Sequence, residues 1–152
     1  MTRYLLDTNI LLRAYDLSSS SSEVAVKAIS LLLEQGDECV LTAQVLIEFW
    51  VVATRPVEVN GLGWNTAKTQ DVVEMLLQQF PLLEESDRVF LNWLALVKTG
   101  NIIGKRTHDV RLIAVMLSHQ VSHLLTFNPS DFTAVSDVVI VHPQELVNRS
   151  AT

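Results

Sequence analysis

Residues 4–9 read Tyr-Leu-Leu-Asp-Thr-Asn, a short apolar run that stops at a carboxylate. An apolar run of this length is typical of a strand whose two faces are both buried in a parallel sheet. The polar residues that follow predict the end of this strand. The helical spacing of the next apolar residues predicts a helix from Asn9 to Tyr15. The chain therefore opens with a strand and a helix that meet at Asp7.

The same alternation of short apolar runs and helical patterns continues along the chain. Further strands are predicted at 39–42, 123–126 and 138–141, with a short additional one at 81–83. Further helices are predicted between Ser20 and Gly36 and at 43–54, 65–80, 86–99 and 109–120. Short strands separated by helices are typical of a parallel sheet covered on both faces. We therefore expect one α/β domain over residues 1–152, a three-layer α/β/α arrangement around a parallel sheet of four to five strands.

Composition narrows the class of protein. Of the 152 residues, 49% are hydrophobic and 18% charged, a balance too apolar for a disordered chain. The single cysteine, Cys39, excludes an internal disulfide. The net charge of −6 means that bulk charge does not hold this chain to nucleic acid. We expect a cytoplasmic protein without a signal peptide or a membrane span.

Three carboxylates attract attention, because ligands of such sheets bind at the carboxyl ends of the strands. Asp7 directly follows the first strand, Glu48 lies among apolar neighbours in a helix, and Asp109 stands at the head of an apolar helix. Each has an ordinary explanation by itself: Asp7 as a turn former, Glu48 as an exposed helix position and Asp109 as a helix N-cap. Together they favour one shared site, and carboxylates that repel one another are usually neutralised by a hard divalent cation.

Such a site suits the chemistry of phosphate esters. A cation held by Asp7 and Asp109 would lower the pKa of a bound water and neutralise charge on a phosphoryl oxygen. Glu48 would bind the cation through water, or would orient the attacking water as a base. Thr8 and Asn9 would position Asp7.

A polyanionic substrate also needs positive charge near the acids. Basic residues close to Asp7 or Asp109 in the sequence are Arg13, Lys98, Lys105, Arg106 and Arg111. They form either a solvated charged surface or a local phosphate-binding rim on an otherwise acidic protein. The second interpretation assigns substrate binding to Arg13, Lys105, Arg106 and Arg111, together with Thr8 and Asn9.

Four motifs, in order, carry a family resemblance. They are Leu-Leu-Asp7-Thr8-Asn9, the isolated Glu48, Gly104-Lys-Arg-Thr-His-Asp109, and Leu125-Thr126-Phe127-Asn128-Pro-Ser-Asp131-Phe132. From Tyr4 to about Val141, the chain resembles the PIN domain family, and within it the VapC-type toxin ribonucleases of bacterial toxin–antitoxin pairs. This resemblance implies a ribonuclease that depends on Mg²⁺ or Mn²⁺.

The resemblance also implies roles for particular residues. It places Asp7, Glu48 and Asp109 in an acidic metal cluster. The fourth position of the family, often acidic, aligns with Asn128, which would hydrogen-bond a carboxylate or a phosphate. Asp131 is a candidate substitute for Asn128 at this position. The resemblance therefore leaves open whether the site holds one metal ion or two.

The resemblance implies protein partners as well. VapC-like proteins commonly form homodimers and are held inactive by a small antitoxin. We expect a homodimer, and an antitoxin tail that lies over residues 43–54, where the apolar surface exceeds one core-facing stripe.

Two other classes of protein fit part of the pattern. A phosphatase with Asp7 as covalent nucleophile needs a second acid two residues on, where the chain has Asn9. A catalytically weak or inactive PIN-fold module that binds RNA or protein would explain Asn128. It would not explain why three mutually repelling acids are present. The sequence therefore favours the metal-dependent nuclease.

Overall fold

The chain folds around one parallel sheet, in a computed structural model that describes residues 1–132 and 137–151. The strands are β1 (Arg3–Leu6), β2 (Glu38–Val40), β3 (His123–Leu125) and β4 (Val139–Val141). They are hydrogen-bonded in the order β2-β1-β3-β4, all parallel. The predicted α/β class with a central parallel sheet is therefore confirmed. The run at 81–83 contributes only a single parallel bridge, between Leu41 and Leu82, and not a full fifth strand.

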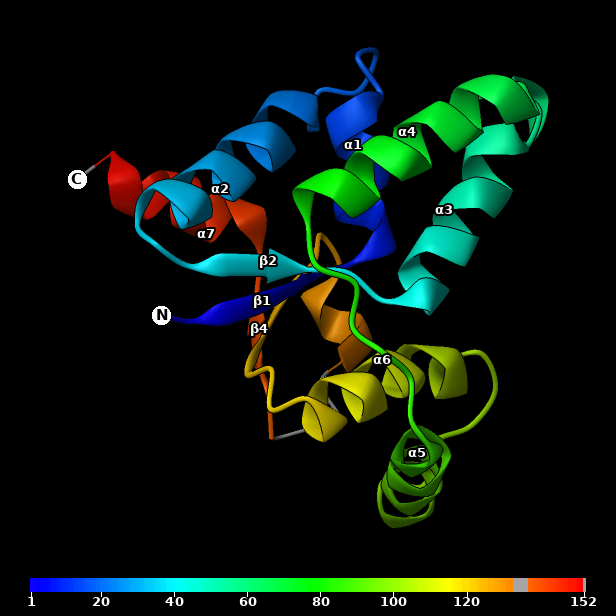
Figure 1. Cartoon of the computed structure of the whole chain (residues 1–152), viewed down its shortest axis with the longest axis vertical. Helices are drawn as coiled ribbons and strands as arrows, with labels where there is room; N and C mark the ends of the chain where they lie inside the picture. The colour runs from blue at the N-terminus through cyan, green and yellow to red at the C-terminus, as the bar shows by residue number, and fades with distance from the viewer. Residues whose placement is uncertain (133–136, 152) are drawn as a thin grey trace.

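Helices cover the sheet. Within the described residues they are α1 (Thr8–Tyr15), α2 (Ser22–Glu34), α3 (Ala43–Thr54), α4 (Thr66–Gln79), α5 (Asp87–Thr99), α6 (Arg106–Ser118) and α7 (Pro143–Ser150), with 3-10 turns at Val57–Val59 and Pro129–Phe132. In Figure 1, α2 and α7 lie on one side of the strands and α6 on the other, which gives the three predicted layers. Helix α5 packs on α6 and projects away from the sheet (Figure 1).

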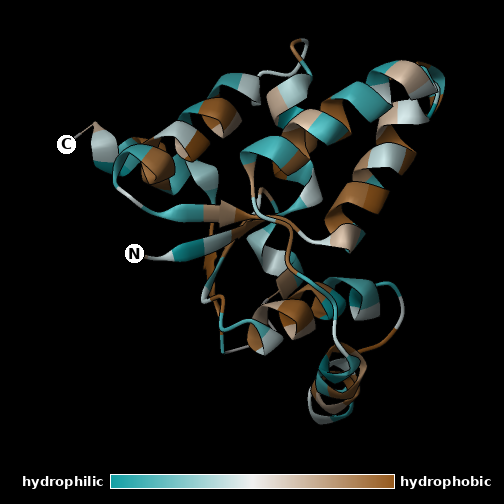
Figure 2. Cartoon of the chain, in the orientation of Figure 1, coloured by the Kyte–Doolittle hydropathy of each residue, from teal (hydrophilic) through white to brown (hydrophobic). Residues whose placement is uncertain are grey.

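The core lies between these layers. Leu5 and Leu6 of β1 and Leu124 and Leu125 of β3 are fully buried, as expected for central strands of a covered parallel sheet. Hydrophobic residues also run along much of α3 (Figure 2). Among the described residues, no helix combines the length and the hydropathy needed to cross a bilayer.

The structure corrects the sequence prediction at two helices. Helix α6 begins at Arg106, not at Asp109, so Asp109 lies in its first turn and is not the N-cap. Gly104, just before this helix, has a φ of +64°, a conformation that glycine adopts without strain. Helix α7 was not predicted. It begins with Pro143, a residue suited to a first helical turn, and packs against α2.

Candidate active site

The carboxyl ends of β1 and β3 bring two polar side chains together. The two strands are direct neighbours, with Leu6 opposite Leu125. The next residues, Asp7 and Thr126, therefore leave the sheet at the same edge. The Thr126 hydroxyl donates a hydrogen bond of 2.8 Å to Oδ2 of Asp7. Asp7 thus lies where ligands bind in parallel sheets.

Asp7 is also held by the start of α1. Its Oδ1 accepts a hydrogen bond of 2.8 Å from the backbone N–H of Thr8, which makes it the N-cap of the helix. The Asn9 side chain donates to Asp7 Oδ2 at 3.3 Å and to Thr126 Oγ1 at 3.1 Å. The carboxylate is therefore a cap and a member of a polar network at once, and Thr8 and Asn9 orient it.

Glu48 of α3 faces this network. The Thr8 hydroxyl lies 3.1 Å from Glu48 Oε2, to which it can donate, and 3.3 Å from the carbonyl oxygen of Val45. Thr8 thus touches Asp7 through its backbone and Glu48 through its side chain. Glu48 is half-buried, so it is not the exposed position that an amphipathic helix by itself would suggest.

Asp109 approaches the same edge from the first turn of α6, where it is half-buried. Its pKa is raised, mainly by burial, then by the negative charges of Asp131 and Glu48. Arg106 and His108 oppose the shift. Asp131 therefore acts on Asp109 more strongly than Glu48 does. Asn128, by contrast, has an exposed side chain, and its backbone N–H donates to Thr126 Oγ1 at 3.1 Å. Asp131 is therefore close enough to Asp109 to raise its pKa, whereas Asn128 takes part through its backbone N–H.

Among the three acids, Asp7 has the pKa that is shifted most. Burial raises the pKa of this carboxyl from 3.8 to about 6. The hydrogen bonds from Thr126 and Thr8 lower it, and the charges of Glu48 and Asp109 raise it. A buried acid that is destabilised in its charged form by two other acids is the arrangement that a bound cation would stabilise.

Gln44, one helical turn before Glu48, is a residue that sequence reasoning missed. Its Nε2 donates to Glu48 Oε1 at 3.0 Å and to the backbone carbonyl of His108 at 2.8 Å. Its Oε1 accepts from Arg111 at 3.1 Å. Gln44 therefore ties α3 to α6 and restrains Glu48. The i,i+4 spacing of the two side chains is the one sequence signal that could have found it.

The predicted basic rim divides into two kinds of residue. Arg111 forms a bidentate ion pair with Glu85, at 2.7 and 3.0 Å. Arg13 donates to Ser21 Oγ at 3.1 Å, and its guanidinium lies over the Phe127 ring. Lys105 and Arg106 are exposed at the start of α6. These last two are the rim residues best placed to contact a phosphate.

Comparisons with known proteins identify the family of this chain. The model of the family described as PIN domain matches residues 4–138. The chain belongs to the PIN domain family. No curated protein sequence matches it.

Solved structures share the fold of this PIN domain at low sequence identity. VapBC2 from Rickettsia felis, solved bound to a DNA fragment from its promoter, aligns with a TM-score of 0.69 and 17% identity over 93% of this chain and 98% of that chain. VapBC-1 from nontypeable Haemophilus influenzae aligns with a TM-score of 0.67 and 21% identity, over 94% of this chain and 99% of that chain. FitAcB from Neisseria gonorrhoeae aligns with a TM-score of 0.61 and 22% identity, over 93% of this chain and 98% of that chain.

The donor set of this PIN domain fits a hard divalent cation. Asp7, Glu48 and Asp109 offer only oxygen ligands, which Mg²⁺ and Mn²⁺ prefer. Across residues 1–132 and 137–151, no group of three or more His, Cys, Asp or Glu side chains is placed so that it could hold a metal ion. Mg²⁺ usually keeps several waters and takes only one or two carboxylates, so it does not need all three acids as direct ligands.

Proposed function

We propose that this PIN domain is a metal-dependent endoribonuclease and the toxin of a toxin–antitoxin pair. The observation that carries the proposal is the buried carboxylate of Asp7, with its pKa raised to about 6, beside Glu48 and Asp109 at the ligand-binding edge of the sheet. Strongly shifted carboxylates in such a position are typical of functional sites. The family membership supports a nuclease, and the fold shared with VapBC and FitAB structures supports a toxin.

Each acid has a separate role in this proposal. Asp7 and Asp109 would hold Mg²⁺ or Mn²⁺, which when bound supplies a water of lowered pKa and neutralises charge on the scissile phosphate. Glu48, restrained by Thr8 and Gln44, orients the attacking water and accepts its proton, or binds the cation through water. Asn128 and Asp131 complete the polar edge beside Asp109.

Substrate phosphates are assigned to the basic residues nearest the acids. Lys105 and Arg106 bind phosphates directly, because they are exposed beside Asp109. Arg13 stands on the other side, next to Phe127. Arg111 acts mainly through Gln44, since Glu85 already neutralises it. Thr8 and Asn9 contribute by orienting Asp7.

Partners follow from the surface of α3 and from the structural neighbours. Ile47 and Val51 on this helix are 64% and 51% exposed, and exposed apolar side chains that gather on one helix favour an interface. We assign this face to a small antitoxin, whose basic side chain would reach Asp7, Glu48 and Asp109 and compete with the cation. We also infer a homodimer and a cytoplasmic location, which the single buried thiol of Cys39 suits.

The test is RNA cleavage with matched variants. Purified protein is incubated with end-labelled single-stranded RNA and Mg²⁺ or Mn²⁺. We expect cleavage that EDTA stops and that Asp7→Asn and Asp109→Asn each abolish. Asp71→Asn, an exposed acid on α4, is the control and should cleave normally. RNA binding without cleavage in any of these metals would instead support the alternative, an inactive PIN-fold binding module.

A further inference from the structure

A cavity of about 350 Å³ lies between α5 and α6, beside the acidic site. Its apolar wall is formed by Val89, Phe90 and Trp93 of α5, and its polar rim includes His108 and Arg111 of α6. This volume is at the small end of the range for sites that bind small ligands. The cavity is therefore suited to a single flat ring system and not to a long side chain or a helix.

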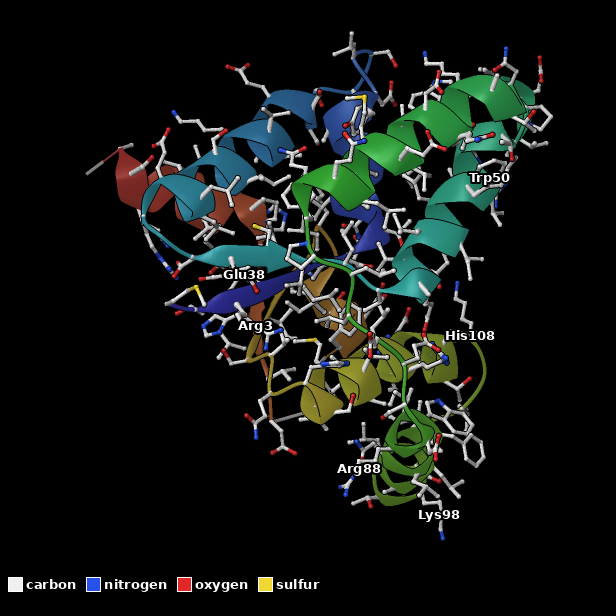
Figure 3. The ribbon with its side chains drawn as sticks, viewed as in Figure 1. Arg3, Glu38, Trp50, Arg88, Lys98 and His108 are labelled. Atoms are coloured by element: carbon white, nitrogen blue, oxygen red, sulfur yellow. The ribbon has the colours of Figure 1, made fainter. Side chains whose placement is uncertain are left out.

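The cavity adjoins a depression that reaches Glu48. A second, shallower depression is lined by Gln44 and Glu48, and it shares Glu85, His108 and Arg111 with the cavity. The hydrogen bond from Gln44 to the carbonyl of His108 joins the two walls at this point. In Figure 3, His108 lies at the end of α6 that faces α3. A chain that passes Glu48 would therefore reach the cavity next.

The aromatic wall is partly rigid and partly exposed. The Trp93 indole N–H donates to the backbone carbonyl of Thr107 at 2.7 Å, and this hydrogen bond holds the Trp93 ring of α5 against α6. The Phe90 ring lies 5.6 Å from the Trp93 ring, tilted by 32°. Phe90 is 60% exposed. Aromatic faces of this kind stack on nucleobases of any sequence.

Charges of both signs lie around the cavity, with an ion pair between Glu85 and Arg111 at its rim. Glu84, Glu85 and Asp87 stand at the start of α5, whereas residues 88–111 beyond them hold five of the 11 Lys and Arg of the chain and one of its 17 acids, Asp109. The whole chain has a net charge of −6, so this segment is a local exception. Figure 3 shows Arg88 and Lys98 extending from α5. Basic residues interleaved with aromatic rings are the combination that binds single-stranded nucleic acid.

We propose that the cavity between α5 and α6 binds an unstacked nucleobase of single-stranded RNA, whose phosphate lies at Lys105, Arg106 and the acids. This inference rests on the proposed function, because it takes the substrate to be RNA. The base stacks on the wall of Phe90 and Trp93. Arg111, Glu85 and His108 stand at the rim, where they face its polar edge.

The experiment compares two probes by fluorescence anisotropy in EDTA. One is fluorescein-labelled octauridine, and the other is a ribose-phosphate chain of the same length that carries no bases. Phe90→Ala should weaken the binding of octauridine about 5- to 100-fold and leave the binding of the baseless chain unchanged. Phe90→Trp should restore octauridine binding. Leu91→Ala is the matched control, because Leu91 is 63% exposed on the same helix but does not line the cavity.

Three outcomes would overturn the base-binding cavity. In the first, Phe90→Ala leaves octauridine binding unchanged. In the second, Phe90→Ala weakens the binding of both probes equally. In the third, Phe90→Ala and Leu91→Ala both weaken octauridine binding, and light scattering traces the loss to a change in oligomeric state. The last outcome would make this face an interface between copies of the chain. RNA cleavage by the unaltered protein is scored separately. Base-dependent binding without cleavage would refute the nuclease and support the cavity, and cleavage with base-independent binding would do the reverse.

Discussion

Thr126 and Asp7 lie 119 residues apart in the chain, yet the Thr126 hydroxyl donates a hydrogen bond of 2.8 Å to Oδ2 of Asp7. Thr126 is fully buried. Its oxygen also accepts hydrogen bonds of 3.1 Å from the Asn9 side chain and from the backbone N–H of Asn128. One buried hydroxyl therefore joins the ends of two neighbouring strands and holds the carboxylate of the site in place.

Removing this hydroxyl should destabilise the protein. Thr126→Val keeps the shape of the side chain but leaves the Asn9 and Asn128 donors without their acceptor. We expect a loss of about 1–3 kcal/mol in the free energy of unfolding, measured by urea titration without metal. Thr126→Ser keeps the hydroxyl and should retain most of that stability. Equal unfolding curves for the two variants would show that the hydrogen bonds contribute nothing.

Asp7 should make stability depend on pH. Its pKa is 3.8 when exposed and about 6 in the folded protein, so the folded state favours the protonated form. Below about pH 4, Asp7 is protonated in both the folded and the unfolded state, and its burial does not lower the free energy of unfolding. As the pH rises through 6, the free energy of unfolding should fall by up to about 3 kcal/mol, and burial of Asp109 acts in the same direction.

Asp7→Asn isolates this effect. The variant has no charge to bury, so its advantage in unfolding free energy over the parent should be larger at pH 7.5 than at pH 4.5, without metal. Asp71→Asn should show no such difference. An advantage that is constant with pH, or that shrinks as the pH rises, would contradict the raised pKa of Asp7. Asp7→Asn and Asp109→Asn should also fold at least as well as the parent at neutral pH, because they relieve repulsion.

Gln44 should position Glu48 without binding substrate. Gln44→Leu removes the hydrogen bonds to Glu48 and His108, and outer contacts of this kind typically contribute 10- to 100-fold to activity. We expect kcat for RNA cleavage to fall about that much while KM changes little. Gln70→Leu is the matched control, since Gln70 donates to Glu74 with the same i,i+4 geometry on exposed α4. A rise in KM alone would indicate a substrate contact instead.

Inhibition by the antitoxin should depend on α3 and on the cation. Ile47→Asp and Val51→Asp place charge on the exposed face of this helix and should weaken antitoxin binding, measured by calorimetry. Val57→Asp is a control at an exposed residue outside α3. Excess Mg²⁺ or Mn²⁺ should restore RNA cleavage if a basic side chain of the antitoxin competes at the acids. Inhibition that is indifferent to metal concentration would exclude charge competition and leave the nuclease assignment intact.

The homodimer is tested by mass in solution. Light scattering at micromolar concentration should give twice the chain mass of 17.0 kDa, because apolar side chains that are also left exposed on α2, such as Val26 and Leu33, favour association. A mass of one chain at that concentration would refute the homodimer.

The sequence by itself determined the sheet and the place of Asp7 at the end of its first strand. Apolar runs such as Leu5-Leu6 and Leu124-Leu125 predict covered parallel strands, and the residue after such a strand lies at its carboxyl end whatever the rest of the fold does. Asp7 was placed correctly for this reason. The helix at 143–150 was missed, because its two buried residues, Pro143 and Leu146, are too few to form an apolar period.

Only the tertiary structure decided which side chains meet across elements. The Gln44 contacts with His108 and Arg111, the ion pair of Arg111 with Glu85 and the effect of Asp131 on Asp109 join residues from different segments. Such contacts depend on how α3, α5 and α6 pack against the sheet and one another. Local periodicity fixes which face of a helix is buried, but not the angle and distance at which two helices cross. The position of Asp7 could therefore be predicted from the sequence, whereas the cavity between α5 and α6 could not.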